Sequence, residues 1–193
     1  MTTETSKPYR LRLPGPTEVP ERVRMATARP IYNHRGSEFA ALLSDVSDLV
    51  RPVMGTKNDV MTFASSGTGV MEASLANVLV PGDKVLVLNN GQWGERFIGI
   101  AKALGLADGL DEIKVTWGEA IAEDALKAKL AATDYAAVVA VHNESSTGTA
   151  ADLHEIGAAV AETDAVLIVD TVSGLGGMEM RQDDWGVDVL VTA

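Results

Sequence analysis

Apolar residues follow two alternating patterns along this chain. Continuous apolar runs such as Val85–Leu88 and Val166–Val169 are typical of strands buried on both faces of a parallel sheet. Apolar residues spaced by three or four positions are typical of helices that pack on such a sheet. The runs predict strands at 60–64, 84–88, 113–117, 135–141, 166–169 and 187–193. The wider spacing predicts helices at 21–28, 119–130 and 152–162, a core-facing helix from Ser37 that stops at Pro52, and helices after Gly69 and Arg96.

The alternation of strands and helices predicts the fold class. It is typical of a three-layer α/β fold, in which helices cover both faces of a mostly parallel sheet joined by right-handed crossovers. No second domain is visible in the pattern. Residues 8–20 hold four of the seven prolines, and proline is excluded from helix interiors and central strands. We therefore expect residues 1–20 to form an extended arm.

Composition and charge narrow the possible functions. A formal net charge of −11 argues against nucleic-acid binding, which needs clustered Lys and Arg. The chain has no Cys, and its three His have no closely spaced acids, so we expect no metal centre. No window approaches about eighteen uninterrupted apolar residues, and the start of the chain has no apolar signal core. We expect no membrane span, no secretion and a cytoplasmic protein.

Four groups that could bind a ligand lie at the ends of predicted strands. Asp170 follows 166–169, Ser145 follows 135–141, Trp93 follows 84–88, and the turn Ser66-Gly67-Thr68 connects 60–64 to the next helix. Because the carboxyl ends of parallel strands meet at one edge of a sheet, we expect these groups to lie close together.

Each group has a structural interpretation beside the functional one. Asp170 either orders the loop that follows it or pairs with a cationic ligand. The turn at Ser66 either caps a helix or binds an anion at the helix N-terminus, and Trp93 is either a core residue or stacks on a flat ligand. A ligand with a phosphate, an aromatic ring, a phenolic oxygen and a basic ring nitrogen would use all of them. Pyridoxal phosphate is such a molecule.

Several motifs, taken in order, resemble those of the class V aminotransferases. The resemblance runs from about Tyr9 to Ala193 and is strongest to the serine–glyoxylate and alanine–glyoxylate branch. It rests on the segments Pro14-Gly15-Pro16-Thr17, Asn33-His34-Arg35-Gly36, Ser66-Gly67-Thr68-Gly69, Asn90-Gly91-Gln92-Trp93-Gly94, His142-Asn143-Glu144-Ser145-Ser146-Thr147-Gly148 and Val169-Asp170-Thr171-Val172-Ser173-Gly174-Leu175-Gly176-Gly177.

The resemblance implies a fold-type I enzyme that uses pyridoxal phosphate. It implies cofactor contacts from Ser66, Gly67 and Thr68 to the phosphate, Trp93 to the ring face, Ser145 to the phenolic oxygen, Asp170 to the ring nitrogen and Val172 to the underside of the ring. Asp170 would thereby assist the cofactor as an electron sink. The amide of Gly15, in a bend between two prolines, is a candidate substrate contact because glycine lets a ligand approach the backbone closely.

The resemblance also implies parts of the enzyme that these 193 residues do not contain. The lysine that forms a Schiff base with the cofactor is expected just after Ala193, and a C-terminal small domain is expected beyond it. We therefore expect residues 21–193 to be part of the cofactor-binding large domain. Without that lysine the piece is expected to be inactive, because transamination needs its amine as imine partner and proton shuttle.

The expected reaction is the transfer of an amino group from serine or alanine to glyoxylate or a similar 2-oxo acid, by a homodimer with a shared active site. Two alternatives remain. The chain is a nucleotide- or phosphate-binding module that uses Ser65–Gly69, although it lacks both G-x-G-x-x-G and the P-loop lysine. Or it is a non-catalytic subunit that keeps the aminotransferase fold.

Overall fold

The computed structural model describes residues 10–193, so the first part of the predicted arm lies outside the described residues. The described chain divides into two compact units, one up to Asp45 and the other from Val46 to Ala193. Residues 10–20 form no helix or strand. The first unit contains α1 (Glu21–Ala26), and α2 (Ser37–Met54) begins in it and ends in the second.

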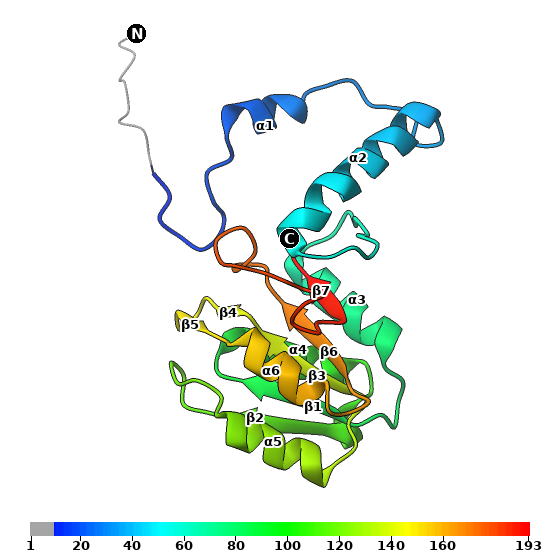
Figure 1. Ribbon diagram of the computed structural model, residues 1–193. Helices are drawn as coiled ribbons and strands as arrows, with labels where there is room; N and C mark the ends of the chain where they lie inside the picture. Colours follow the sequence, from blue (N-terminus) through cyan, green and yellow to red (C-terminus); the bar gives the residue numbers. More distant parts are fainter. Residues whose placement is uncertain (1–9) are drawn as a thin grey trace. The chain divides into compact units, whose positions relative to one another are not determined.

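The second unit is built on a five-stranded sheet of order β2-β1-β3-β6-β7, in which every neighbouring pair is parallel (Figure 1). The strands are β1 (Val85–Asn89), β2 (Leu110–Lys114), β3 (Ala137–Val141), β6 (Val166–Asp170) and β7 (Val189–Val191). The three central strands follow the predicted apolar runs, because strands covered on both faces keep nearly every side chain from water.

Helices cover both faces of the sheet, which confirms the three-layer α/β prediction. Alternate residues of β1 point to opposite sides: Val85 and Val87 pack with α3 (Gly67–Val78) and α4 (Gln92–Ala103). Leu86 and Leu88 pack with α5 (Glu123–Ala132) and α6 (Leu153–Val160). Two smaller elements complete the fold: a 3₁₀ turn η1 (Ala107–Gly109) and an antiparallel pair β4 (Asn143–Glu144) and β5 (Thr149–Ala150).

The predicted strand at 60–64 is wrong. This segment has no regular structure, and Met61 and Phe63 are 75% and 57% exposed. A strand needs a neighbour that accepts and donates backbone hydrogen bonds, and the five-stranded sheet includes no such neighbour for it. Short apolar runs therefore predict a strand only where a partner exists.

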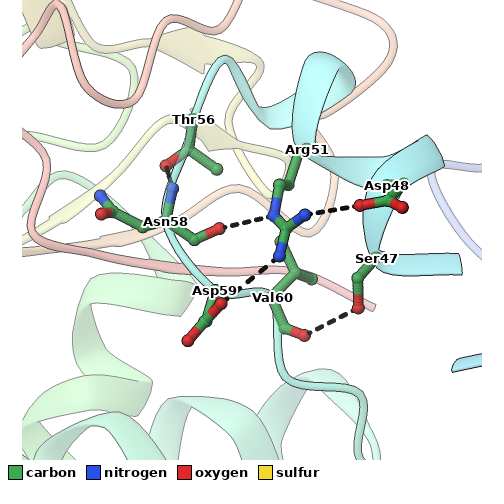
Figure 2. Close-up of polar contacts among 7 residues, drawn as sticks. All are labelled: Ser47, Asp48, Arg51, Thr56, Asn58, Asp59 and Val60. Carbon is green, nitrogen blue, oxygen red and sulfur yellow. Dashed lines mark hydrogen bonds and ion pairs between the residues drawn. The ribbon is translucent and has the colours of Figure 1, made fainter. Parts of the chain in front are cut away.

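Side-chain contacts from α2 hold the chain at 58–60, where this segment begins (Figure 2). The guanidinium of Arg51 donates to the backbone oxygen of Asn58 at 2.9 Å and pairs with Asp48 at 2.6 Å and Asp59 at 3.4 Å. The hydroxyl of Ser47 donates to the backbone oxygen of Val60 at 3.4 Å. These contacts fix the path of the chain between the end of α2 and the turn that begins α3.

The helix predicted from Ser37 differs from expectation in two ways. It continues through Pro52 to Met54, because a proline in the last turn costs one hydrogen bond without displacing the rest of the helix. It is also not core-facing: Met54 is its only buried residue, and Leu49 is 74% exposed. The apolar spacing identifies the face that is suited to packing but not whether anything covers it.

Element boundaries shift at the sheet edges. The predicted strand at 113–117 is observed as β2 at Leu110–Lys114, and the helix predicted from Glu119 begins at Glu123. The last strand is confined to Val189–Val191. No helix among residues 10–193 is both long and apolar enough to cross a membrane.

Candidate functional site

The turns after β1, β3 and β6 meet at the carboxyl edge of the sheet. The amide of His142, just after β3, donates to the backbone oxygen of Asp170 at 2.8 Å. The amide of Thr171, just after β6, donates to the backbone oxygen of Val191 at 2.8 Å. These bonds continue the sheet past the strand ends, so the side chains that follow are held on a rigid edge.

Asp170 is a buried carboxylate that has no positively charged partner among residues 10–193. Its side chain is 4% exposed, and Oδ1 accepts a hydrogen bond of 2.8 Å from the amide of Val172. Among the described residues, no Lys or Arg pairs with it. Burial, and to a smaller extent the negative charge of Glu144, raises the pKa of Asp170 to about 6. A protonated ring nitrogen would relieve this cost by pairing with the carboxylate.

A polar pair supports the loop that carries Asp170. His142 is 3% exposed, and its Nδ1 lies 3.1 Å from the hydroxyl of Thr171. Burial lowers the pKa of His142, which favours the neutral imidazole. The hydroxyl of Ser173 donates to the backbone oxygen of Asn143 at 2.9 Å. The chain that follows Asp170 is thus bonded to the turn after β3 at two points.

Trp93 and Ser145 are in direct contact. The indole Nε1–H of Trp93 donates to the hydroxyl of Ser145 at 2.8 Å, and Arg96 lies over the indole ring with its guanidinium carbon 5.8 Å from the ring centroid. Because the Ser145 oxygen accepts from the indole, its own proton is free to be donated to a ligand. Trp93 is half-buried, so part of its side chain remains accessible.

The turn at the start of α3 has the geometry of an anion site. Ser66 is the N-cap of α3, and its hydroxyl accepts from the amide of Gly69 at 3.2 Å. The amides of Gly67 and Thr68 donate to no protein group among residues 10–193. Both therefore point outward from a helix N-terminus, where the helix dipole favours a negative charge.

Gly67 connects this turn to the Asp170 loop. A Cβ built on Gly67 would lie 3.1 Å from a methyl group of Val172 and 3.8 Å from Ala193. The small glycine therefore lets the anion turn approach Val172, which is 38% exposed. Thr68 also lines one hollow with Gln92 and Arg96 from α4. The turn at Gly67 is thus close to Val172 and to the start of α4, whereas a shared set of phosphate, ring and nitrogen contacts stays a prediction.

Gly15 is the only sequence-predicted site residue that belongs to the first unit among the described residues. A Cβ added there would meet no atom of residues 10–193 within 4 Å, so no close approach among those residues requires glycine. Its role as a substrate contact stays a prediction.

Sequence reasoning missed Glu144, although it was part of a quoted motif. Its side chain is 0% exposed and its carboxylate accepts from the amide of Trp93 at 2.9 Å. The signal was an acid directly beside a predicted ligand residue, after a strand end. Only the fold shows that this acid faces inward to the protein, because strand neighbours point to opposite sides.

The donor set fits pyridoxal phosphate. A buried carboxylate without a cation suits a basic ring nitrogen, a serine hydroxyl with a free proton suits a phenolic oxygen, and outward amides at a helix N-terminus suit a phosphate. No group of three or more His, Asp or Glu gathers to hold a metal ion within the described part of the chain.

Comparison with known proteins agrees with this arrangement. The family model described as Aminotransferase class-V matches residues 21–193. An L-aspartate–glyoxylate aminotransferase of Paracoccus denitrificans is 37% identical over 93% of this chain and 46% of its own length. A serine–glyoxylate aminotransferase of Methylorubrum extorquens is 34% identical over 97% of this chain and 48% of its own length.

A solved structure is similar over the whole chain. The crystal structure of an alanine–glyoxylate aminotransferase from Nostoc sp. matches 100% of this chain and 51% of that protein, with a TM-score of 0.91 and 32% identity. The chain thus spans about half the length of the relatives that it matches.

Proposed function

The chain belongs to the class V aminotransferases, and from this premise we propose that the full-length protein is a pyridoxal-phosphate-dependent transaminase. It transfers an amino group from a small amino acid, serine or alanine, to glyoxylate or a similar 2-oxo acid. Residues 21–193 form part of its cofactor-binding large domain, and the small domain lies elsewhere in the full-length protein.

The observation that carries the proposal is Asp170, a buried carboxylate that no cationic side chain in the described range neutralises. The hydrogen bond between Trp93 and Ser145 adds to it. Bound here, pyridoxal phosphate would supply an electron sink for the deprotonation of the substrate Cα. Asp170 keeps a negative charge toward the ring nitrogen, so that the nitrogen holds its proton. The backbone amide of Val172 fixes the orientation of this carboxylate.

The other side chains bind and orient. The amides of Gly67 and Thr68, with the hydroxyls of Ser66 and Thr68, donate to the phosphate at the start of α3. The Trp93 indole would cover one face of the ring, and Val172 would lie against the other. Ser145 donates its hydroxyl proton to the phenolic oxygen, since its oxygen already accepts from Trp93.

Glyoxylate is proposed as the acceptor because the names of all three compared proteins include it, whereas their amino donors differ. The test is a transamination assay on the full-length protein with glyoxylate and serine, alanine or aspartate. We expect glycine and the matching 2-oxo acid from serine or alanine. Absence of pyridoxal phosphate binding, together with tight nucleotide binding in calorimetry, would overturn the proposal in favour of a nucleotide-binding module.

We also propose that two copies assemble with a shared site. Four large apolar side chains between residues 49 and 63 are exposed, a surface suited to being covered in the full-length assembly. They are Leu49, Val53, Met61 and Phe63. Light scattering on the full-length protein should give twice the mass of one chain, and a monomer at micromolar concentration would contradict this assembly.

A further inference from the structure

We propose that Glu144 is a positioning residue that sets the orientation of Trp93 and Ser145 for the cofactor. This inference rests on the proposed function, because it assigns Glu144 a role toward the same site. Glu144 does not contact the cofactor in this scheme. It acts through Trp93 and Ser145.

The carboxylate of Glu144 is fully used by hydrogen-bond donors of the protein. Oε2 accepts from the amide of Trp93 at 2.9 Å, and Oε1 accepts from the amide and the hydroxyl of Ser146 at 3.1 and 2.5 Å. The side chain is 0% exposed. An acid is rarely buried in this way unless its hydrogen bonds are complete, so the carboxylate is a fixed point in the structure.

These bonds replace a cap that α4 lacks. The N-cap of α4 is Gly91, which has no side chain to accept from the first amides of the helix. The hydroxyl of Ser146 accepts from the amide of Gln92 at 3.0 Å, and Glu144 accepts from that of Trp93. A negative charge at this end is also favoured by the helix dipole. The turn at 144–146 therefore caps α4 from a distant part of the chain.

Gly91 is small because Glu144 occupies the space of a side chain. A Cβ added to Gly91 would lie 2.4 Å from Cγ and 2.5 Å from Cδ of Glu144. The carboxylate thus packs directly against the backbone at the start of α4. This close approach restricts Glu144 to the one position from which it reaches Trp93.

Two consecutive residues bind the backbone amide and the indole N–H of Trp93. Glu144 binds the backbone amide, and Ser145 binds the indole N–H at 2.8 Å. Rotation of the indole would break the second bond, and movement of the helix start would break the first. The plane of the ring that stacks on the cofactor is therefore determined by the turn after β3.

Every partner of the Glu144 side chain is a donor, so an amide cannot replace it. Glutamine has one oxygen and one NH₂ group, and the NH₂ would face a donor from either Trp93 or Ser146. Glu144→Gln therefore keeps the size of the side chain and removes one set of bonds. This makes it a sharper variant than Glu144→Ala.

The test uses the full-length protein, first without cofactor. The indole N–H signal of Trp93 in the nitrogen–proton NMR spectrum, assigned by its loss in Trp93→Phe, reports the bond to Ser145. We expect Glu144→Gln to shift or broaden this signal and to weaken pyridoxal phosphate binding about tenfold, the scale of one charge-assisted hydrogen bond. The matched control is Asp152→Ala, which removes the side-chain cap of α6 on the other face of the sheet. It should lower the melting temperature without moving the Trp93 signal or the affinity.

An unchanged Trp93 signal and affinity in Glu144→Gln would overturn the inference. If that variant does not fold, Ser146→Ala provides the same readout, because it removes the bond to Glu144 and the cap on Gln92 while keeping the carboxylate. A shifted signal with weaker binding in Ser146→Ala supports the inference, and no change in either overturns it. If the wild-type protein binds no pyridoxal phosphate, the proposed function fails, whereas the NMR result without cofactor still decides whether Glu144 positions Trp93.

Discussion

The helices α3 and α4 are consecutive helices of the chain, but their first amides are capped in different ways. The start of α3 is exposed, and its own Ser66 caps it by accepting from Gly69. The start of α4 has no cap of its own, and its amides are bound by Glu144 and Ser146, 51 and 54 positions away from their partners along the chain.

This difference separates two tasks. At α3 the amides of Gly67 and Thr68 donate to no group in the described part of the protein, so they remain available for an anion. At α4 the amides of Gln92 and Trp93 are already used, so this helix start does not bind a ligand through them. It supports a side chain instead. A glycine-containing helix start is therefore an anion site only when the protein leaves its amides unbound.

The largest expected effect is on the rate of transamination, and it comes from a buried residue, Asp170. Asp170→Asn should lower the transamination rate of the full-length protein by about 10²–10³-fold, the range seen when one preorganised electrostatic group is removed. The melting temperature without cofactor should not fall, because the variant removes a buried charge that no cationic side chain in the described part of the chain balances. A rate within a factor of about two of wild type would contradict the role of Asp170.

The same variant should change how stability depends on pH. The pKa of Asp170 in the folded chain, about 6, lies above the 3.8 of an ordinary aspartate, so between these values the folded state binds more protons than the unfolded state. The contribution of Asp170 to the free energy of unfolding is thus greatest below about pH 4 and falls as pH rises to about 6. The loss is on the order of 3 kcal/mol. Denaturant titrations of cofactor-free protein should show this fall in wild type and lack it in Asp170→Asn; parallel curves would contradict the shift.

A glycine pair tests the distant cap of α4. Gly91→Ala places a methyl group against Glu144 and should destabilise the protein by about 1–3 kcal/mol. Gly99→Ala, in the same helix with no atom within 4 Å of the added Cβ, should be neutral or stabilise by up to about 1 kcal/mol. Urea titration measures both. Equal changes in the free energy of unfolding for the two variants would mean that Glu144 can move away from the added methyl group without destabilising the protein.

The smallest expected effect lies at the local cap of α3. Ser66→Ala should lower the free energy of unfolding by about 1 kcal/mol, because the bond to Gly69 is lost. Ser66→Asp keeps a capping oxygen but adds negative charge, so it should preserve stability and weaken pyridoxal phosphate binding more than Ser66→Ala does. Fluorescence titration with the cofactor and thermal melting distinguish these outcomes. If Ser66→Asp binds as tightly as wild type, the phosphate does not lie at this turn.

The sequence by itself determined the central sheet and the cap of α3. The runs at 84–88, 135–141 and 166–169 predict β1, β3 and β6 because full burial requires continuous apolar residues. The cap at Ser66 involves an amide three residues away, so it is also a property of neighbours in the chain. The edge strand β2 and the helix α5 were predicted only approximately, since their partial exposure weakens the apolar pattern.

Only the tertiary structure decided what 60–64 and Glu144 do. The first lacks a neighbouring strand, and the backbone oxygen of its first residue, Val60, accepts from Ser47. The second faces inward and binds the amide of Trp93 at the start of α4, 51 positions earlier in the chain. A local pattern carries no information on either partner. Sheet pairing and distant caps depend on which segments the fold brings together, because hydrogen bonds and packing act over a few ångströms in space and not along the sequence.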